Sequence, residues 1–355
     1  MYTSCIIYID VIKLVTLCRI KPRAKYGWKY RDYGYFKNIK MGYSSVKLFF
    51  IPKSGAEEGG FCLGNLYIEF SAPKFFEETN ESGLPLEDLD TVYDNLIEVL
   101  DYYHILPPLD SEGWSQTSFE ITKLESSITL YFNSQEEVDE HLRLFRMRYF
   151  PYHKPNMLNR KEQDYDTTVY HGTKSEDIVL YDKKKETEEH NSWDSDDTDD
   201  DFNNVYMLRL EFRRKKSTKK IEEDLQRDSF GTFADLAGEN QYMLRRIRRF
   251  RLDLPNIPKD EYFELLDGLF EVSRTTEKKR KSIREYCKYI NEHGENQAKK
   301  KSSYKYNECV KFTEDLGVSV LYTQFEHPTW LVSPIVTEKL EKSFTIENFQ
   351  KEWCY

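Results

Sequence analysis

Apolar and polar residues alternate, or β-branched and aromatic residues cluster, in several short stretches of the chain. Each stretch is bounded by turn residues or by charge, which is typical of β-strands. The pattern predicts strands at residues 6–17, 46–52, 61–72, 118–132, 167–171, 176–183 and 204–213. Strands dominate the first 215 residues.

Two segments between these strands have the period of an amphipathic helix instead. Residues 86–103 place apolar side chains at spacings of three and four. Residues 134–148 do the same, and Ser134 followed by Glu137 is a helix-start signature. Strands, helix, strand, helix and further strands predict an α+β fold, with an antiparallel or mixed central sheet that carries helices on one face.

The pattern changes beyond residue 215, where helical periods and heavy charge prevail and Pro255 and Pro258 act as breaks. A chain of 355 residues also exceeds the usual size of one compact domain. We therefore place a domain boundary near residue 216. It separates a first domain at 1–215 from a mainly helical region at 216–355.

The formal charge of −10 comes almost entirely from one segment, residues 186–201, which holds nine acids and no Lys or Arg. The rest of the chain is close to neutral. Such an acidic block repels itself and buries nothing, so we expect a disordered insert at 186–203.

Cysteine usage and hydropathy predict a cytoplasmic protein. The six cysteines show no CxxC pair or metal-ligand spacing, which favours reduced thiols. No apolar run approaches the ~20 residues that span a bilayer. The most apolar segment, near the start, is interrupted by Asp10 and Lys13 and reads as a strand. We expect no membrane partner.

Tyr181 is a candidate nucleophile because it ends an apolar strand and is followed at once by a run of lysines. A phenol with a pKa near 10 attacks poorly at neutral pH, so nearby ammonium groups or a metal-polarised phosphate must assist it. Lys183 and Lys184 are placed to do this. The alternative is a tyrosine that only packs, which is the ordinary role of a strand tyrosine.

Three carboxylates lie within otherwise apolar strands: Asp10, Glu125 and Glu211. Such an acid has to be solvated at an edge, paired, or bound to an ion. Hard divalent cations prefer oxygen ligands, so these residues are candidate ligands for Mg²⁺ or Mn²⁺. Glu211 has a second interpretation, since Arg209 and Arg213 stand two positions away and point to the same face.

Residues 4–215 resemble the rolling-circle replication initiators of the filamentous-phage gene II type and of related plasmids. Tyr-x-Gly-Thr-Lys-Ser at 170–175, Tyr-Asp-Lys-Lys-x-Glu at 181–186 and Leu-Arg-Leu-Glu at 208–211 carry the resemblance. The segments 9–14, 71–74 and 122–125 agree with it. Glu125 stands where that family usually has Asp.

The resemblance implies an HUH-like endonuclease that nicks one strand of origin DNA and keeps the 5′-phosphate on a tyrosine. Tyr181 would attack, Lys184 and Lys183 would stabilise charge, and Glu125, Glu211 and Asp10 would hold Mg²⁺ or Mn²⁺. The chain has no His-x-His pair, so ligation has to follow a carboxylate-based variant. Tyr170 stays open as the nucleophile, although Tyr-x-x-Lys at Tyr181 fits the wider endonuclease pattern better.

Basic residues outside these motifs predict contacts with the DNA backbone, because neutralising phosphates releases counterions. Five arginines fall within residues 245–251, and a second basic run spans 278–281. The predicted contacts are Lys74, Arg245, Arg246, Arg248, Arg249, Lys279 and Arg280. Origin DNA is the expected partner. Host helicase or other replication proteins and a homodimer are left open.

Two rival interpretations remain. One keeps the fold without catalysis, as an origin-binding or regulatory protein. The other is an unrelated interaction module whose acidic loop and basic helices bind proteins, which would make the tyrosine motif accidental.

Overall fold

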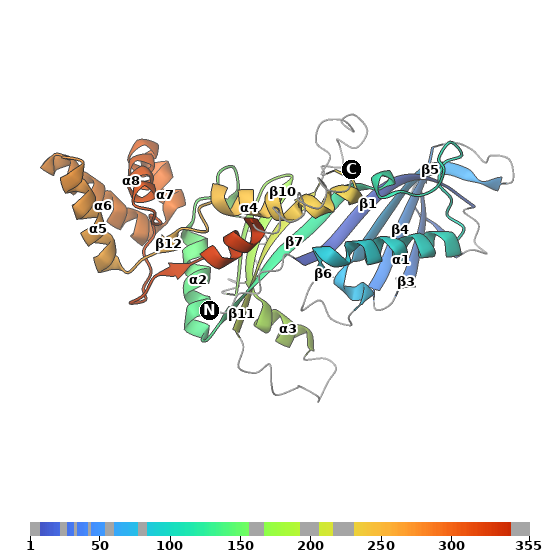
Figure 1. The fold of residues 1–355 in the computed structure, drawn as a ribbon, viewed down its shortest axis with the longest axis horizontal. Coiled ribbons are helices and arrows are strands. Elements are labelled where there is room, and N and C mark those ends of the chain that lie inside the picture. The colour runs from blue at the N-terminus through green and yellow to red at the C-terminus, as the bar shows by residue number, and fades with distance from the viewer. Residues whose placement is uncertain are drawn as a thin grey trace, which may run out of the picture.

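The computed structural model describes residues 8–21, 27–31, 34–41, 44–53, 60–76, 84–155, 167–191, 206–215 and 231–341. Its centre is an antiparallel sheet of eleven strands (Figure 1). The order across the sheet is β2 (Lys29–Arg31), β3 (Gly34–Met41), β4 (Ser44–Pro52), β5 (Cys62–Ser71), β1 (Tyr8–Ile20), β7 (Glu120–Phe132), β11 (Tyr206–Lys215), β10 (Glu176–Asp182), β9 (Thr168–Gly172) and β8 (Lys154–Pro155), with β6 (Leu84–Pro85) paired to β1.

Each of the seven predicted strands is confirmed. The strands β2 and β3 were missed, because in β3 a charged residue occupies a core position and breaks the alternation. Lys37 is buried, with its ammonium 3.7 Å from the ring centroid of Tyr103 and 5.9 Å from that of Trp28. Cation–π contacts with these two rings stabilise the buried ammonium, so a lysine can occupy this core position.

Helices α1 (Leu89–Tyr102), α2 (Gln135–Met147) and α4 (Glu239–Arg249) lie over one face of the sheet (Figure 1). The predicted start of α2 is confirmed, since Ser134 Oγ accepts a hydrogen bond from Glu137 N at 3.3 Å. The α+β prediction is therefore confirmed at this level. None of the described helices has the length and apolar character needed to cross a membrane.

Two apolar cores hold these layers together. The first joins α1 to β1 and β3–β5, with residues such as Ile12, Ile68 and Leu96. The second joins α2, β10, β11 and the end of β7 to α4 and to the C-terminal helices. Those helices are α5 (Lys259–Val272), α6 (Glu277–His293), α7 (Glu295–Lys301) and α8 (Ser303–Asp315).

The predicted boundary near residue 216 falls in a segment, 216–230, outside the described residues. Residues on both sides of it belong to the same core: Leu210 of β11 and Met243 of α4 are both fully buried there. The helical region therefore packs against the sheet through shared apolar contacts.

The prediction of a disordered insert beginning at residue 186 is wrong for its first part. Helix α3 spans Lys183–Asn191, and residues 192–205 lie outside the described ranges. Asp182 Oδ1 accepts a hydrogen bond from Lys185 N at 3.1 Å, which caps the helix start. The ammonium of Lys183 contacts Glu186 Oε2 at 2.6 Å, one turn later. The acidic block thus begins inside a helix whose first turn supplies the opposite charge.

Candidate functional site

Tyr181 and Glu211 are brought together by the pairing of β10 with β11. Tyr181 lies opposite Arg209, and Glu211 lies opposite Ser127 of β7. Because alternate residues of a strand share a face, all four point away from the core that contains α2 and α4. The phenol of Tyr181 donates a hydrogen bond to Glu211 Oε1 at 2.6 Å. The predicted nucleophile and one predicted ligand are direct partners.

Asp10 joins this group through a β-bulge. The register of β1 against β7 shifts between Ile9 and Val11, so Asp10 has no single partner in the ladder. Bulges redirect side chains and are frequent beside active sites. Here the carboxylate of Asp10 contacts the guanidinium of Arg209 at 3.4 Å, on the Tyr181 side of the sheet.

The environment of Asp10 is dominated by burial, which raises its pKa to about 6. The Arg209 guanidinium opposes this shift, while the negative charges of Glu211 and Glu125 add to it. The three predicted carboxylates are therefore close enough to influence one another. Neither Asp10 Oδ2 nor the adjacent Ser127 Oγ has a hydrogen bond of good geometry within the described part of the chain.

Each carboxylate has a basic partner. Glu211 contacts Arg213 at 2.5 Å, and Glu125 contacts Lys123 at 2.8 Å. Across the described ranges, no three His, Cys, Asp or Glu side chains form a group that could hold a metal ion. In this arrangement Arg209, Arg213 and Lys123 neutralise the three carboxylates, so a divalent cation would have to displace these basic groups to bind. Binding of Mg²⁺ or Mn²⁺ by Asp10, Glu125 and Glu211 stays a prediction.

Tyr181 is only 8% exposed. Burial raises the pKa of its phenol well above the ordinary range, and the neighbouring Glu211 raises it further. The phenol is therefore protonated at neutral pH. Glu211 is the group placed to take its proton.

Sequence reasoning named Arg209 and Arg213 only as same-face neighbours of Glu211 and did not assign them to the site. Arg209 is fully buried, and burial lowers its pKa less than the neighbouring Asp10, Tyr181 and Glu211 raise it. Arg213 is held in the same way by Glu211. The signal was the two-residue spacing of Arg209, Glu211 and Arg213, which puts all three on one face of a strand.

Lys183 and Lys184, predicted to assist Tyr181, form the start of α3. Lys183 is buried against Glu186, and the ammonium of Lys184 lies 4.7 Å from the ring centroid of Tyr206 in β11. Both side chains therefore have partners within α3 and β11, so their role in assisting Tyr181 stays a prediction.

Tyr170 lies on the same face as Tyr181. It pairs with Val179, which in turn pairs with Glu211. Tyr170 therefore lies in the same cross-strand row as Glu211, and Tyr181 lies in the next row on that face. The choice between the two tyrosines stays open.

The predicted DNA contacts divide into two sets. Arg245, Arg248 and Arg249 are exposed on α4, and Lys74 is half-buried in the turn at Pro73–Phe75. The other three have partners within the fold, although Lys279 is also exposed and Arg248 of the first set contacts Glu341. Arg246 contacts Glu176 at 2.8 Å, and Lys279 contacts Glu308 at 2.8 Å. Arg280 donates to the carbonyl of Phe270 in the last turn of α5 and to that of Thr275 just after the helix.

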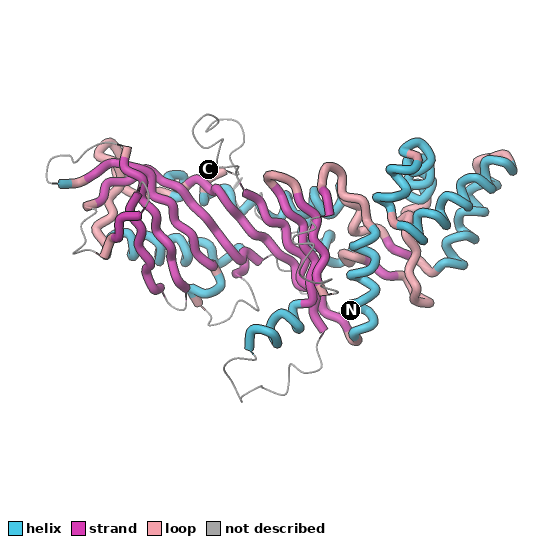
Figure 2. The backbone as a smooth tube through the Cα atoms, turned by 180° about the vertical axis from the view of Figure 1, so that it is seen from behind, coloured by secondary structure: helices cyan, strands magenta, loops and turns pink. Residues whose placement is uncertain are grey.

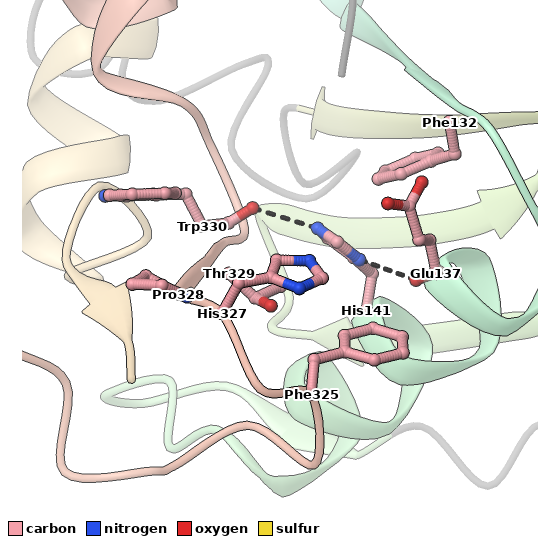
Figure 3. Close-up of a pocket in the computed structure, with 8 residues that line it drawn as sticks. All are labelled: Phe132, Glu137, His141, Phe325, His327, Pro328, Thr329 and Trp330. Atoms are coloured by element: carbon pink, nitrogen blue, oxygen red, sulfur yellow. Dashed lines mark hydrogen bonds between the residues drawn. The ribbon is translucent and has the colours of Figure 1, made fainter. Parts of the chain in front are cut away.

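An aromatic pocket of about 160 Å³ lies at the start of α2, apart from the Tyr181 cluster (Figure 3). The ring of His141 bridges two backbone carbonyls there, that of Glu137 at 2.6 Å and that of Trp330 at 3.0 Å. This contact fastens the C-terminal segment to α2. The pocket is lined by Phe132, Glu137, His141, Phe325, His327, Pro328, Thr329 and Trp330.

Comparisons with protein-family models, curated proteins and solved structures find no match to this chain. The interpretation of the site therefore depends on its own chemistry.

Proposed function

We propose that the protein is a replication initiator that nicks one strand of origin DNA, with Tyr181 as the nucleophile on an HUH-like sheet. The observation that carries the proposal is the hydrogen bond of 2.6 Å from Tyr181 to Glu211, flanked by two arginines on the same strand as Glu211. A phenol, a proton acceptor and fixed positive charge are the components that attack on a phosphodiester requires.

In the proposed reaction Glu211 accepts the phenolic proton as Tyr181 Oη attacks phosphorus. A bond forms between Oη and phosphorus while the bond from phosphorus to the 3′-oxygen breaks. The 3′-oxygen takes up a proton from solvent water and leaves as a hydroxyl, and the 5′-phosphate stays on Tyr181. Arg213, whose side chain is 34% exposed, and the buried Arg209 supply positive charge to the transferred phosphate.

A divalent cation would polarise the phosphate and assist the leaving group. Asp10, Glu125 and Glu211 are the residues predicted to hold it. The proposed reaction uses protein groups and solvent water alone, because Arg209, Lys123 and Arg213 neutralise these carboxylates.

The test is a search for covalent protein–DNA adducts after incubation with supercoiled DNA of the protein's own replicon. Reactions with Mg²⁺ and with a chelator are run in parallel on a denaturing gel. We expect an adduct with the wild type and with Tyr170→Phe, and none with Tyr181→Phe. Loss of the adduct in Tyr170→Phe alone would transfer the role to Tyr170.

A second candidate is an origin-binding protein without catalysis. The burial of Tyr181 and the raised pKa of its phenol favour it. Specific binding of origin DNA without any adduct, with or without divalent cations, would establish this alternative and overturn the nicking proposal.

A further inference from the structure

One face of the large sheet is free of described helices along β4, β5, β1 and β7. Figure 2 shows these strands from behind, with α1 and α4 on the far side. The burial pattern agrees: Leu66, Ile68 and Phe70 of β5 are buried towards α1, while the alternate positions are partly exposed. The open face carries side chains that the apolar cores do not use.

A row of lysines crosses this face. Lys47 of β4 lies opposite Glu69 of β5, and Glu69 lies opposite Lys13 of β1. Lys13 then lies opposite Lys123 of β7, and Lys123 opposite Lys215 of β11. Neighbouring strands are about 4.8 Å apart. The four lysine side chains are 34% to 56% exposed.

This arrangement has an electrostatic cost. Lys13, Lys123 and Lys215 stand directly opposite one another on three adjacent strands, and like charges in that position destabilise a sheet. Glu69 is shared, at 3.4 Å from Lys13 and 3.2 Å from Lys47. Glu125 at 2.8 Å from Lys123 and Asp177 at 3.0 Å from Lys215 offset part of the repulsion. The four lysines still outnumber these three acids, so a bound polyanion would complete the compensation, and the row fits a phosphate backbone.

An aromatic row runs beside the lysine row, two residues further along the strands. Phe36 of β3 lies opposite Phe49 of β4, and Phe49 lies opposite Tyr67 of β5. The rings of Phe49 and Tyr67 have centroids 6.4 Å apart and are half-buried on the open face. Aromatic rings beside cations bind unpaired bases by stacking, whereas a duplex hides the faces of its bases. The combination therefore fits single-stranded nucleic acid.

The lysine row is continuous with the Tyr181 cluster. Along β11 from Lys215, the next residues on the same face are Arg213, Glu211 and Arg209, which lies opposite Tyr181. Six residues of strand cover about 20 Å. A single strand held on the lysine row reaches Tyr181 within a few nucleotides.

We infer that this open face binds single-stranded DNA, with phosphates on the row of Lys47, Lys13, Lys123 and Lys215 and bases on Phe49 and Tyr67. The inference that the bound strand leads to Tyr181 rests on the proposed function. The inference that the face binds single-stranded DNA is independent of it.

The inference is tested by fluorescence anisotropy with labelled oligo-dT, using full-length Tyr181→Phe protein in a chelator so that no strand is cut. In this background, Lys13→Ala with Lys47→Ala should weaken binding at least tenfold at low salt. It should also make the dependence of log K on log salt shallower by about 1.4, since each phosphate contact contributes ~0.7 for single strands. Lys13→Arg with Lys47→Arg should preserve binding.

Tyr67→Leu probes the aromatic row. It should weaken oligo-dT binding about tenfold, because stacking on an aromatic ring is lost, and leave duplex binding unchanged. Lys259→Ala with Lys311→Ala is the matched control, since both lysines are exposed on the C-terminal helices. Circular dichroism melting verifies that each variant is folded.

Two outcomes would overturn the inference. One is unchanged oligo-dT affinity in the folded Lys13 and Lys47 variant. The other is loss of affinity only in Arg248→Ala with Arg249→Ala, which would place the strand on α4. Absence of a covalent adduct together with normal dependence on the lysine row would refute nicking and leave the binding face standing.

Discussion

The residues around Tyr181 bury an unusual amount of charge. Asp10, Arg209 and Glu211 are each less than 5% exposed, and burial of a charged group is costly unless it is paired. Each has an opposite charge within 3.4 Å. Their pairing explains how the fold tolerates the cluster, while the cost of assembling it is consistent with a functional role.

Asp10 should make stability depend on pH. Its pKa is raised from 3.8 to about 6 in the folded protein, so the folded state binds the proton more tightly than the unfolded chain. This contribution to stability is fully present below the unfolded pKa and is lost as pH rises through 6. Urea unfolding of the wild type and of Asp10→Asn is measured at several pH values between 4 and 7. As pH rises over this range, the free energy of unfolding of the wild type should fall relative to that of the variant. An equal difference at every pH would contradict the assignment.

Glu211→Gln should slow nicking by about 10²–10⁴-fold, because the amide cannot accept the phenolic proton. Single-turnover formation of the covalent adduct is the measurement. Glu98→Gln, at an exposed position of α1, is the matched control and should react like the wild type. A normal rate for Glu211→Gln would exclude this residue as the proton acceptor.

Among the helices, α3 differs from α1 and α2 in the interactions that stabilise it, which are polar instead of apolar. Its sequence, KKKETEEHN, contains no apolar residue, whereas α1 buries Leu89, Val92, Leu96 and Leu100. The described contacts of α3 are polar: the Asp182 cap, the Lys183 ion pair and Lys184 over Tyr206. Since Tyr181 lies two residues before this helix, a DNA strand that reaches Tyr181 also meets α3.

We expect α3 to exchange its amide hydrogens faster as salt concentration rises, because screening weakens its ion pairs. The amides of α1 should be insensitive to salt over the same range, since apolar packing holds that helix. Hydrogen exchange followed by mass spectrometry at low and high salt measures both in one sample. Protection of α3 equal to that of α1 at high salt would show that another contact holds it.

Across the whole molecule, the C-terminal helices share one core with the strands that carry Tyr181 and Glu211. Ile128 and Leu210 from the sheet, and Met243 and Ile247 from α4, are all fully or almost fully buried in it. His141 adds a polar link by contacting the carbonyl of Trp330. The sheet and the helical region therefore depend on each other for burial.

The fragment 1–215 should not fold as an independent nickase, because removing residues 216–355 exposes the apolar face of β7, β10 and β11. We expect it to bind a hydrophobic dye strongly and to lack a cooperative thermal transition. The full chain is the control. A soluble fragment with a sharp transition would show that the first 215 residues form a complete domain.

The amino-acid sequence alone was sufficient to predict the elements that depend on local alternation. The strands β1, β4, β5, β7, β9, β10 and β11 and the helices α1 and α2 follow from apolar periodicity and a capping serine, which act between near neighbours. It also singled out Tyr181, Glu211 and Asp10, because an acid or a strand-ending tyrosine beside charge is chemically conspicuous in any context.

Which of these residues meet depends on contacts between segments that are far apart in the chain. The bulge at Asp10, the pairing of Arg209 with Asp10 and the row from Lys47 to Lys215 arise from registers between strands far apart in the chain. The shared core across residue 216 and the burial of Lys37 have the same origin. Register depends on the packing of whole faces against one another, and periodicity within a single strand does not contain it.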